Sequence, residues 1–173
     1  MTKKILLTLS LLIISVMTMS ALKPADFAGK WVSDEVSMSN DPAMPIKACY
    51  SFNFNANGGA GASLGMTINV SAGKQSIKYN VYLTGTGKFT VDGNTLTVTL
   101  DKRSIRGECP LSEIRVNGEG EFTPEKVQVM MDQNLGSMME MLQEPNVFQN
   151  VTLNGSGFTA TQDGATFTFK KQK

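Results

Sequence analysis

Alternation of apolar and polar side chains runs through most of this chain and limits its fold more than any other feature. Tyr50, Phe52 and Phe54 alternate with Ser51 and Asn53. In a strand, this spacing places the aromatic groups on one face and the polar groups on the other. The same period of two recurs at 66–70, 77–84, 89–91, 96–100, 151–153, 158–160 and 167–169. Because strands with one wet face are typical of antiparallel sheets, the sequence predicts a mostly β domain.

Turn sequences separate these alternating stretches. Asp92-Gly93, Asn154-Gly155 and Asp163-Gly164 each lie between two of them, which is a strong hairpin signal. The glycine-rich stretch 57–61 also lies between strands, and we interpret it as a hairpin turn. Short strands with frequent turns predict an antiparallel up-and-down barrel of about eight to ten strands. A β-sandwich is the alternative.

One segment, near 124–142, has helical periodicity instead. Thr123-Pro124-Glu125 has the pattern of an N-cap, a proline at the first helical position and an acid in the first turn. The apolar residues that then share one helical face are Val127, Met131, Leu135, Met138 and Leu142. We expect this helix to lie on the barrel or to cap one of its ends.

The first residues have the pattern of a secretory signal peptide. Lys3 and Lys4 precede an apolar stretch at 5–16, and Ser20 and Ala21 offer small residues for cleavage. The stretch is too short to span a bilayer, which takes about 20 apolar residues, and no cysteine follows it to carry a lipid anchor. We therefore expect a signal peptide at 1–21, one domain at 22–173 with no transmembrane segment, and a periplasmic or secreted protein.

The two cysteines, Cys49 and Cys109, both fall in the part expected to be exported. Oxidising compartments favour disulfides, and two cysteines allow one intramolecular pairing. The predicted Cys49–Cys109 bond would close a loop of about 60 residues and stabilise the fold by roughly 4 kcal/mol in the chain-entropy model. The sequence has no C-x-x-C motif, so a structural role is favoured over a redox-catalytic one.

Charge and residue types argue against several classes of function. Without Lys3 and Lys4, 14 of the 16 basic residues remain against 15 acids, a balance that does not predict nucleic-acid binding. Histidine is absent, which removes the usual general base and the commonest zinc ligand. Glu119 and Glu121, on one face of an expected strand, are interpreted as solvent-facing acids and not as a catalytic pair. We expect no enzyme, no metal site and no cofactor.

A cluster of methionines is the unusual feature of the helical segment. Its members are Met130, Met131, Met138, Met139 and Met141. Thioethers bind Cu(I), but methionine more often fills gaps in cores and at adaptable binding surfaces. Since three of the five would not share a face with Met131 and Met138, packing or contact with an apolar ligand is favoured over copper binding.

The start of the expected domain reads Asp26-Phe27-Ala28-Gly29-Lys30-Trp31. A short polar lead followed by Gly-x-Trp resembles the first signature of lipocalins and of secreted bacterial lipocalin-like domains, and the stretches 52–58 and 87–96 resemble their hairpins. The resemblance implies an eight-stranded up-and-down barrel whose closed end is plugged by Trp31. The family's arginine that packs on this tryptophan has Lys170 or Lys171 as its nearest equivalent here.

The same resemblance implies a non-enzymatic protein that holds a small hydrophobic ligand in or at the mouth of the barrel. The side chains that would line the site are Tyr50, Phe52, Phe54, Tyr79, Phe167 and Phe169. They fit a plain filled core equally well. The alternative is therefore a filled β domain that acts through its surface, as a protein- or glycan-interaction module or an inhibitor at the cell envelope. The expected partner is a small hydrophobic molecule in the first case and an envelope or extracellular protein in the second.

Overall fold

A computed structural model describes residues 21–39 and 41–173 of the chain. The expected signal peptide lies outside these residues, apart from its last position. Across the described ranges, none of the helices combines the length and the apolar character needed to cross a membrane.

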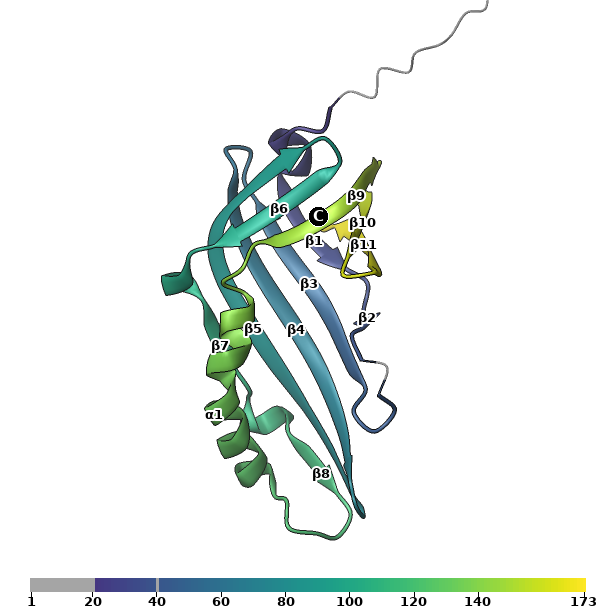
Figure 1. Cartoon of the computed structure of the whole chain (residues 1–173), viewed down its shortest axis with the longest axis vertical. Coiled ribbons are helices and arrows are strands. Elements are labelled where there is room, and N and C mark those ends of the chain that lie inside the picture. Colours follow the sequence, from purple (N-terminus) through teal and green to yellow (C-terminus); the bar gives the residue numbers. More distant parts are fainter. Residues whose placement is uncertain (1–20, 40) are drawn as a thin grey trace, which may run out of the picture.

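Eight antiparallel strands close into a barrel (Figure 1). They are β1 (Gly29–Ser33), β3 (Ile46–Phe54), β4 (Gly59–Ala72), β5 (Gln75–Asp92), β6 (Thr95–Leu100), β9 (Asn146–Asn154), β10 (Gly157–Gln162) and β11 (Ala165–Lys171). Each strand pairs with the next of the eight, and β1 pairs with both β3 and β11, which closes the ring. The predicted up-and-down barrel is therefore confirmed, and the sandwich alternative is not adopted.

The hairpin turns lie where the sequence predicts them. Asp92-Gly93 joins β5 to β6, Asn154-Gly155 joins β9 to β10, and Asp163-Gly164 joins β10 to β11. Gly93 has a φ of +57°, a left-handed conformation that glycine adopts without steric cost. The stretch 57–61 contains the β3–β4 turn, with β4 beginning at Gly59.

Two strands, β4 and β5, are longer than the others and continue past the barrel (Figure 1). Along its length β5 pairs first with β8 (Arg115–Asn117), then with β7 (Arg106–Glu108) and finally with β6. We call the lower part of the β4–β5 hairpin, residues 64–83, together with β7, β8 and the single helix, the extension. The strands β7 and β8 and the short β2 (Val36–Ser37), which pairs with β3, were not predicted from the sequence.

The helix α1 (Pro124–Met141) confirms the prediction of a helix near 124–142. The Thr123 hydroxyl accepts a hydrogen bond from the Lys126 backbone N–H, as an N-cap does. The helix packs closely on β7, where a Cβ at Gly107 would lie 3.0 Å from Leu83 and 3.3 Å from Leu135. The side chains buried from this segment are Val127, Met131, Leu135 and Leu142.

Aromatic side chains fill the barrel interior. They are Phe27, Trp31, Tyr50, Phe52, Phe54, Phe89, Phe148, Phe158, Phe167 and Phe169. The most exposed of them, Tyr50, is 6% exposed. Their contacts are stacked, tilted or edge-to-face, with ring centroids between 4.3 Å (Phe158–Phe169) and 6.4 Å (Phe27–Phe54) apart. This is the packing of a solid aromatic core.

One end of the barrel is covered by η1 (Pro24–Phe27), a short 3-10 helix that leads into β1. Phe27 from η1 is fully buried, and its backbone carbonyl accepts a hydrogen bond from the indole N–H of Trp31. The Nζ atom of Lys171 lies 5.2 Å from the centroid of the Trp31 ring, within the range of a cation–π contact. Of the two lysines considered from the sequence, Lys171 is thus the one over the tryptophan.

The predicted disulfide is wrong, because Cys49 and Cys109 are both free thiols. Cys49 pairs with Gly65, Gly65 with Tyr82, and Tyr82 with Glu108, the neighbour of Cys109. Three strand spacings of about 4.8 Å therefore separate the two positions, whereas a disulfide needs Cα atoms within about 7 Å. Their side chains also differ in environment, since Cys109 is buried in the core and Cys49 is partly exposed.

Candidate functional site

Five of the six predicted ligand-lining residues lie together in the barrel core. They are Tyr50, Phe52, Phe54, Phe167 and Phe169, and each contacts at least two other aromatic rings. Burial, and then the nearby Asp163 carboxylate, raise the pKa of Tyr50. The rings pack against one another, and none of the five is more than 6% exposed.

Tyr79 lies apart from the other five, in the extension. It pairs with Ile68 of β4, on the face of the sheet that continues the barrel interior. Burial, and then the nearby Cys109, raise the pKa of Tyr79. This inner face of the extension is apolar, and its partly buried members on β4 and β5 are Met66, Val70, Ala72 and Tyr79. The structure thus divides the predicted site between a filled barrel and a partly open extension.

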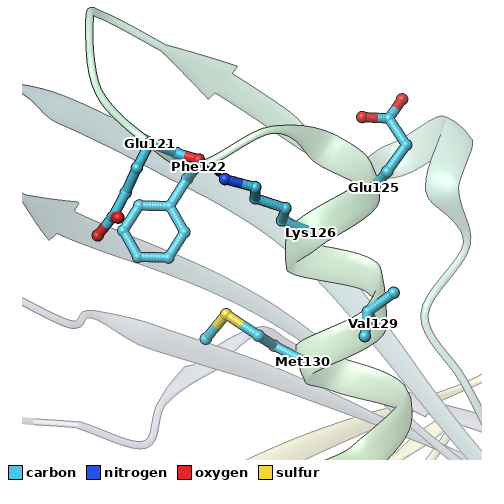
Figure 2. A pocket seen from close by; sticks show the side chains of 6 residues that line it. All are labelled: Glu121, Phe122, Glu125, Lys126, Val129 and Met130. Carbon is cyan, nitrogen blue, oxygen red and sulfur yellow. Dashed lines mark hydrogen bonds between the residues drawn. The ribbon is translucent and has the colours of Figure 1, made fainter.

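A hollow of about 510 Å³ lies beside the first turns of α1, and we call it the α1 hollow (Figure 2). Its lining residues are Glu121, Phe122, Glu125, Lys126, Val129 and Met130. Phe122, Lys126 and Met130 project from one side of the chain in Figure 2, whereas Glu125 points away from them. Val129 is 57% exposed and Met130 is 49% exposed, which is unusual for such apolar groups.

Phe122 is fixed at the base of this hollow by the first residue of β5. The Gln75 side chain donates a hydrogen bond of 3.0 Å to the Phe122 carbonyl and accepts one of 3.1 Å from its backbone N–H. Gln75 itself is buried, so this pair of bonds ties the entry of α1 to the sheet. The hollow is therefore formed by the loop that enters α1 and by one flank of the first turns of α1.

The methionines of α1 divide into buried and exposed members. Met131 packs in the core, and Met139 lies against Gly107 of β7. Met130 and Met141, which are eleven residues apart and so share one flank of the helix, are 49% and 75% exposed. Met138 is partly buried between these groups. An exposed methionine flank of this kind suits an adaptable apolar contact.

The loop and helix around the hollow are strongly acidic. Residues 119–144 hold six acids and one base, Lys126. Ion pairs of the described residues join Lys47 to Glu35 and Lys170 to Asp34, and none involves these six acids. Hydrogen bonds from its own backbone N–H and from the Thr123 hydroxyl lower the pKa of Glu125.

Two acids of the loop before α1 are not where the sequence predicts them. Glu119 and Glu121 lie in the loop between β8 and α1, not on a strand face, and both are exposed as expected. The Nζ atom of Lys126 donates a hydrogen bond of 2.8 Å to the Glu121 backbone carbonyl. Since the ion pairs of the described residues do not include the Glu121 carboxylate, it can attract a cationic group.

A polar cluster lies on the outer face of the extension. Both Asn80 and Tyr82 donate a 2.8 Å hydrogen bond to the same oxygen of Glu113, and these bonds lower the pKa of that carboxyl. Cys49 and the Lys47–Glu35 ion pair line a small hollow of about 180 Å³ beside it. Among the residues with described positions, no group of three or more Cys, Asp or Glu side chains is arranged to hold a metal ion.

The methionines of α1 stand out in the sequence, whereas Phe122 and Val129 were not predicted as site residues. Phe122 follows a Gly-Glu-Gly-Glu stretch with no period of its own, and Val129 stands on the polar side of the predicted helix. An apolar residue on a polar helix face was the available signal for Val129. Neither the protein-family models nor the curated proteins that were compared with this chain match it. Function is therefore inferred from the geometry.

Proposed function

We propose that this is an exported, non-enzymatic binding protein that holds its partner at the extension and not inside the barrel. The observation that carries the proposal is the aromatic core, in which every ring is at most 6% exposed. A barrel of eight strands has room for either side chains or one small ligand, and here side chains take that room. This is the filled-domain hypothesis, in which a surface serves as an interaction module or inhibitor at the cell envelope.

We further propose that the barrel is lipocalin-like. Two observations support this: the eight strands form an up-and-down ring that opens with Gly29-Lys30-Trp31, and Lys171 lies over the tryptophan. In this view Trp31 and Phe27 plug the end covered by η1, and the extension continues from the opposite end. The binding surface then lies on the extension, beyond the mouth of the barrel.

The α1 hollow is the best-supported contact area for the partner. Exposed apolar groups on a folded surface mark interaction sites when they gather in one place. Phe122, Val129 and Met130 gather around a volume that lies within the range typical of ligand pockets. Methionine adapts its shape to what it contacts, which suits a binding surface better than a rigid core.

A second candidate is a small hydrophobic molecule held at the inner face of the extension. Tyr79 supports it, because this residue alone of the six predicted ligand-lining residues lies outside the aromatic packing. Its apolar neighbours Met66 and Val70 are only partly buried. A ligand here would lie at the mouth of the barrel without entering it.

Titration with N-phenyl-1-naphthylamine, a neutral dye that fluoresces in apolar surroundings, tests both candidates. We expect saturable binding to the purified protein and at least about tenfold weaker binding by Met130→Lys, with Met38→Lys as the matched control because Met38 is 48% exposed elsewhere. Loss of binding in Tyr79→Ala but not in Met130→Lys would select the second candidate. No dye binding, or equal binding by Met130→Lys and Met38→Lys with Tyr79→Ala unchanged, would contradict the proposal.

A further inference from the structure

We propose that the α1 hollow and the exposed methionine flank of α1 bind a basic amphipathic segment of a partner protein. The inference rests on the proposed function and names the class of partner for the same surface. One or two apolar side chains of the segment enter the hollow between Phe122 and Met130, and its basic side chains face the surrounding carboxylates.

The hollow has the size and the lining for large aliphatic or aromatic side chains. Its volume of about 510 Å³ is bounded by Phe122, Val129 and Met130 on the apolar side. Figure 2 shows the Phe122 ring and the Met130 thioether projecting to the same side of α1, with the Lys126 stem between them. Thioether and aromatic groups offer a contact that adjusts to different apolar side chains.

The distance between the two exposed methionines of α1 favours a peptide over a small molecule. Met130 and Met141 are eleven helical residues apart, which corresponds to roughly 17 Å along the axis at about 1.5 Å per residue. An amphipathic helix of about three turns has the same length and presents its apolar stripe continuously. A single small ligand in the hollow would leave Met141 without a contact.

The charge of this surface indicates that the partner segment is positively charged. The six acids of residues 119–144 stand against one base, whereas the rest of 22–173 holds nine acids and 13 bases. The loop and helix around the hollow thus carry a net negative charge, which attracts a cationic segment to this surface. The same charge disfavours a symmetric dimer through this surface, because the six acids of each copy would face those of the other.

Two lysines near the hollow should repel a basic segment, and this repulsion can be tested. Lys126 lines it, and Lys74 lies at the neighbouring β4–β5 turn beside Glu119 and Glu121. The ammonium of Lys126 is held at the Glu121 carbonyl and would still repel a basic segment. Lys126→Gln should therefore strengthen the binding of a cationic peptide.

Fluorescence anisotropy with designed peptides tests the inference. The probe is a labelled peptide of about 18 residues with leucine on one helical face and lysine on the other. One control peptide has the same composition in a scrambled order, and another replaces lysine by glutamate. We expect the leucine–lysine peptide to bind at least about tenfold tighter than either control, and its binding to weaken between about 50 and 300 mM salt.

Variants locate the contact on the protein. Met130→Lys should weaken binding of the leucine–lysine peptide at least about tenfold, and Glu121→Gln should weaken it by about two- to fivefold. Met38→Lys and Asp92→Asn are matched controls on other surfaces and should leave it unchanged. Circular dichroism verifies that each variant is folded. Equal binding of the lysine and glutamate peptides, or equal effects of Met130→Lys and Met38→Lys, would overturn the inference.

The dye and the peptide separate this inference from the proposed function. Dye binding that is lost in Met130→Lys, without binding of the leucine–lysine peptide, overturns the peptide inference and leaves the proposed function standing. Failure of both probes on folded protein overturns both. Displacement of the dye by the leucine–lysine peptide, with no displacement by the glutamate peptide, supports both.

Discussion

The barrel and the extension share the two long strands β4 and β5 but are packed with different kinds of side chain. Ten aromatic rings fill the barrel, and the most exposed of them is 6% exposed. The extension is packed with aliphatic and methionine side chains under α1, and three of its large apolar side chains, Val129, Met130 and Met141, are about half or more exposed. The difference indicates a rigid support joined to an adaptable surface.

The two packings also differ in how much they should contribute to stability. Aromatic rings bury large areas and contact one another at defined geometries, so the loss of one leaves a cavity that neighbours cannot fill. Methionine and leucine side chains at the edge of a helix can rearrange and remain partly hydrated. Substitutions in the two regions should therefore differ in their effect on the free energy of unfolding.

The largest effect is expected in the barrel. Phe158→Ala removes a fully buried ring that contacts Phe27, Trp31 and Phe169 at centroid distances of 5.4, 5.0 and 4.3 Å. We expect the free energy of unfolding to fall by about 3–5 kcal/mol, measured by urea denaturation. A loss below about 1 kcal/mol would show that the interior is not packed as described.

A smaller loss is expected in the extension. Leu135→Ala removes a side chain that packs against Gly107 but is 9% exposed. The free energy of unfolding should fall by about 2 kcal/mol in the same urea experiment. A loss equal to that of Phe158→Ala would remove the contrast between the two regions.

These expectations separate what the sequence could predict from what it could not. Alternation correctly placed Phe52 and Phe54 on the inner face, because the period of two depends on the strand alone. It does not show whether inward rings meet one another or enclose a ligand. The alternation at 77–84 and 89–91 likewise does not show the point where β5 leaves the barrel, and three-residue strands such as β7 are too short to show a period.

The disulfide prediction was wrong for a related reason. Two cysteines in an oxidising compartment can form a disulfide, but whether they do depends on the order of their strands and on the sheet face that each side chain occupies. Cys49 and Cys109 lie in segments separated by β4 and β5, which only the topology reveals. In the candidate site, the methionines of α1 could be recognised from the sequence. The hydrogen bonds that hold Phe122 to Gln75 of β5 could not, because these two residues are far apart in the sequence.

A modest gain in stability is expected from the helix. Gly136 lies in the middle of α1, is exposed, and has no atoms near the position of an added Cβ. Gly136→Ala should raise the free energy of unfolding by about 0.5–1 kcal/mol, because alanine loses less backbone entropy on folding. Thermal denaturation measures the change, and a fall in stability would mean that the helix is not regular there.

A pH-dependent effect is expected from Glu113. Because Asn80 and Tyr82 donate to its carboxylate, its pKa lies below the ordinary 4.5 in the folded state. The stabilisation is therefore present above about pH 4.5 and is lost as the pH falls through the lowered value. Glu113→Gln should be less stable than the natural protein at neutral pH, and the difference should vanish in acid. A difference that grows on acidification would contradict the assignment.

No change in thermal stability is expected when a reducing agent is added. With both thiols free, the thermal midpoint should be the same with and without reductant. Cys49 should react with a thiol reagent in the folded protein, whereas Cys109 is buried, and burial followed by the charges of Asp132 and Glu113 raises its pKa. Cys109 should therefore react with the thiol reagent only after the protein unfolds. A lower thermal midpoint in the presence of reductant would show that Cys49 and Cys109 form a disulfide after all.

Methyl NMR of the methionines tests the central claim most directly, since all eight methionines of 22–173 lie in the described residues. The account predicts that N-phenyl-1-naphthylamine shifts the methyl signal of Met130 while those of Met38 and Met44 stay in place. The aromatic signals of the barrel core should also be unchanged. Shifts of the core aromatic signals with Met130 unaffected would mean that the barrel interior, and not the extension, holds the ligand.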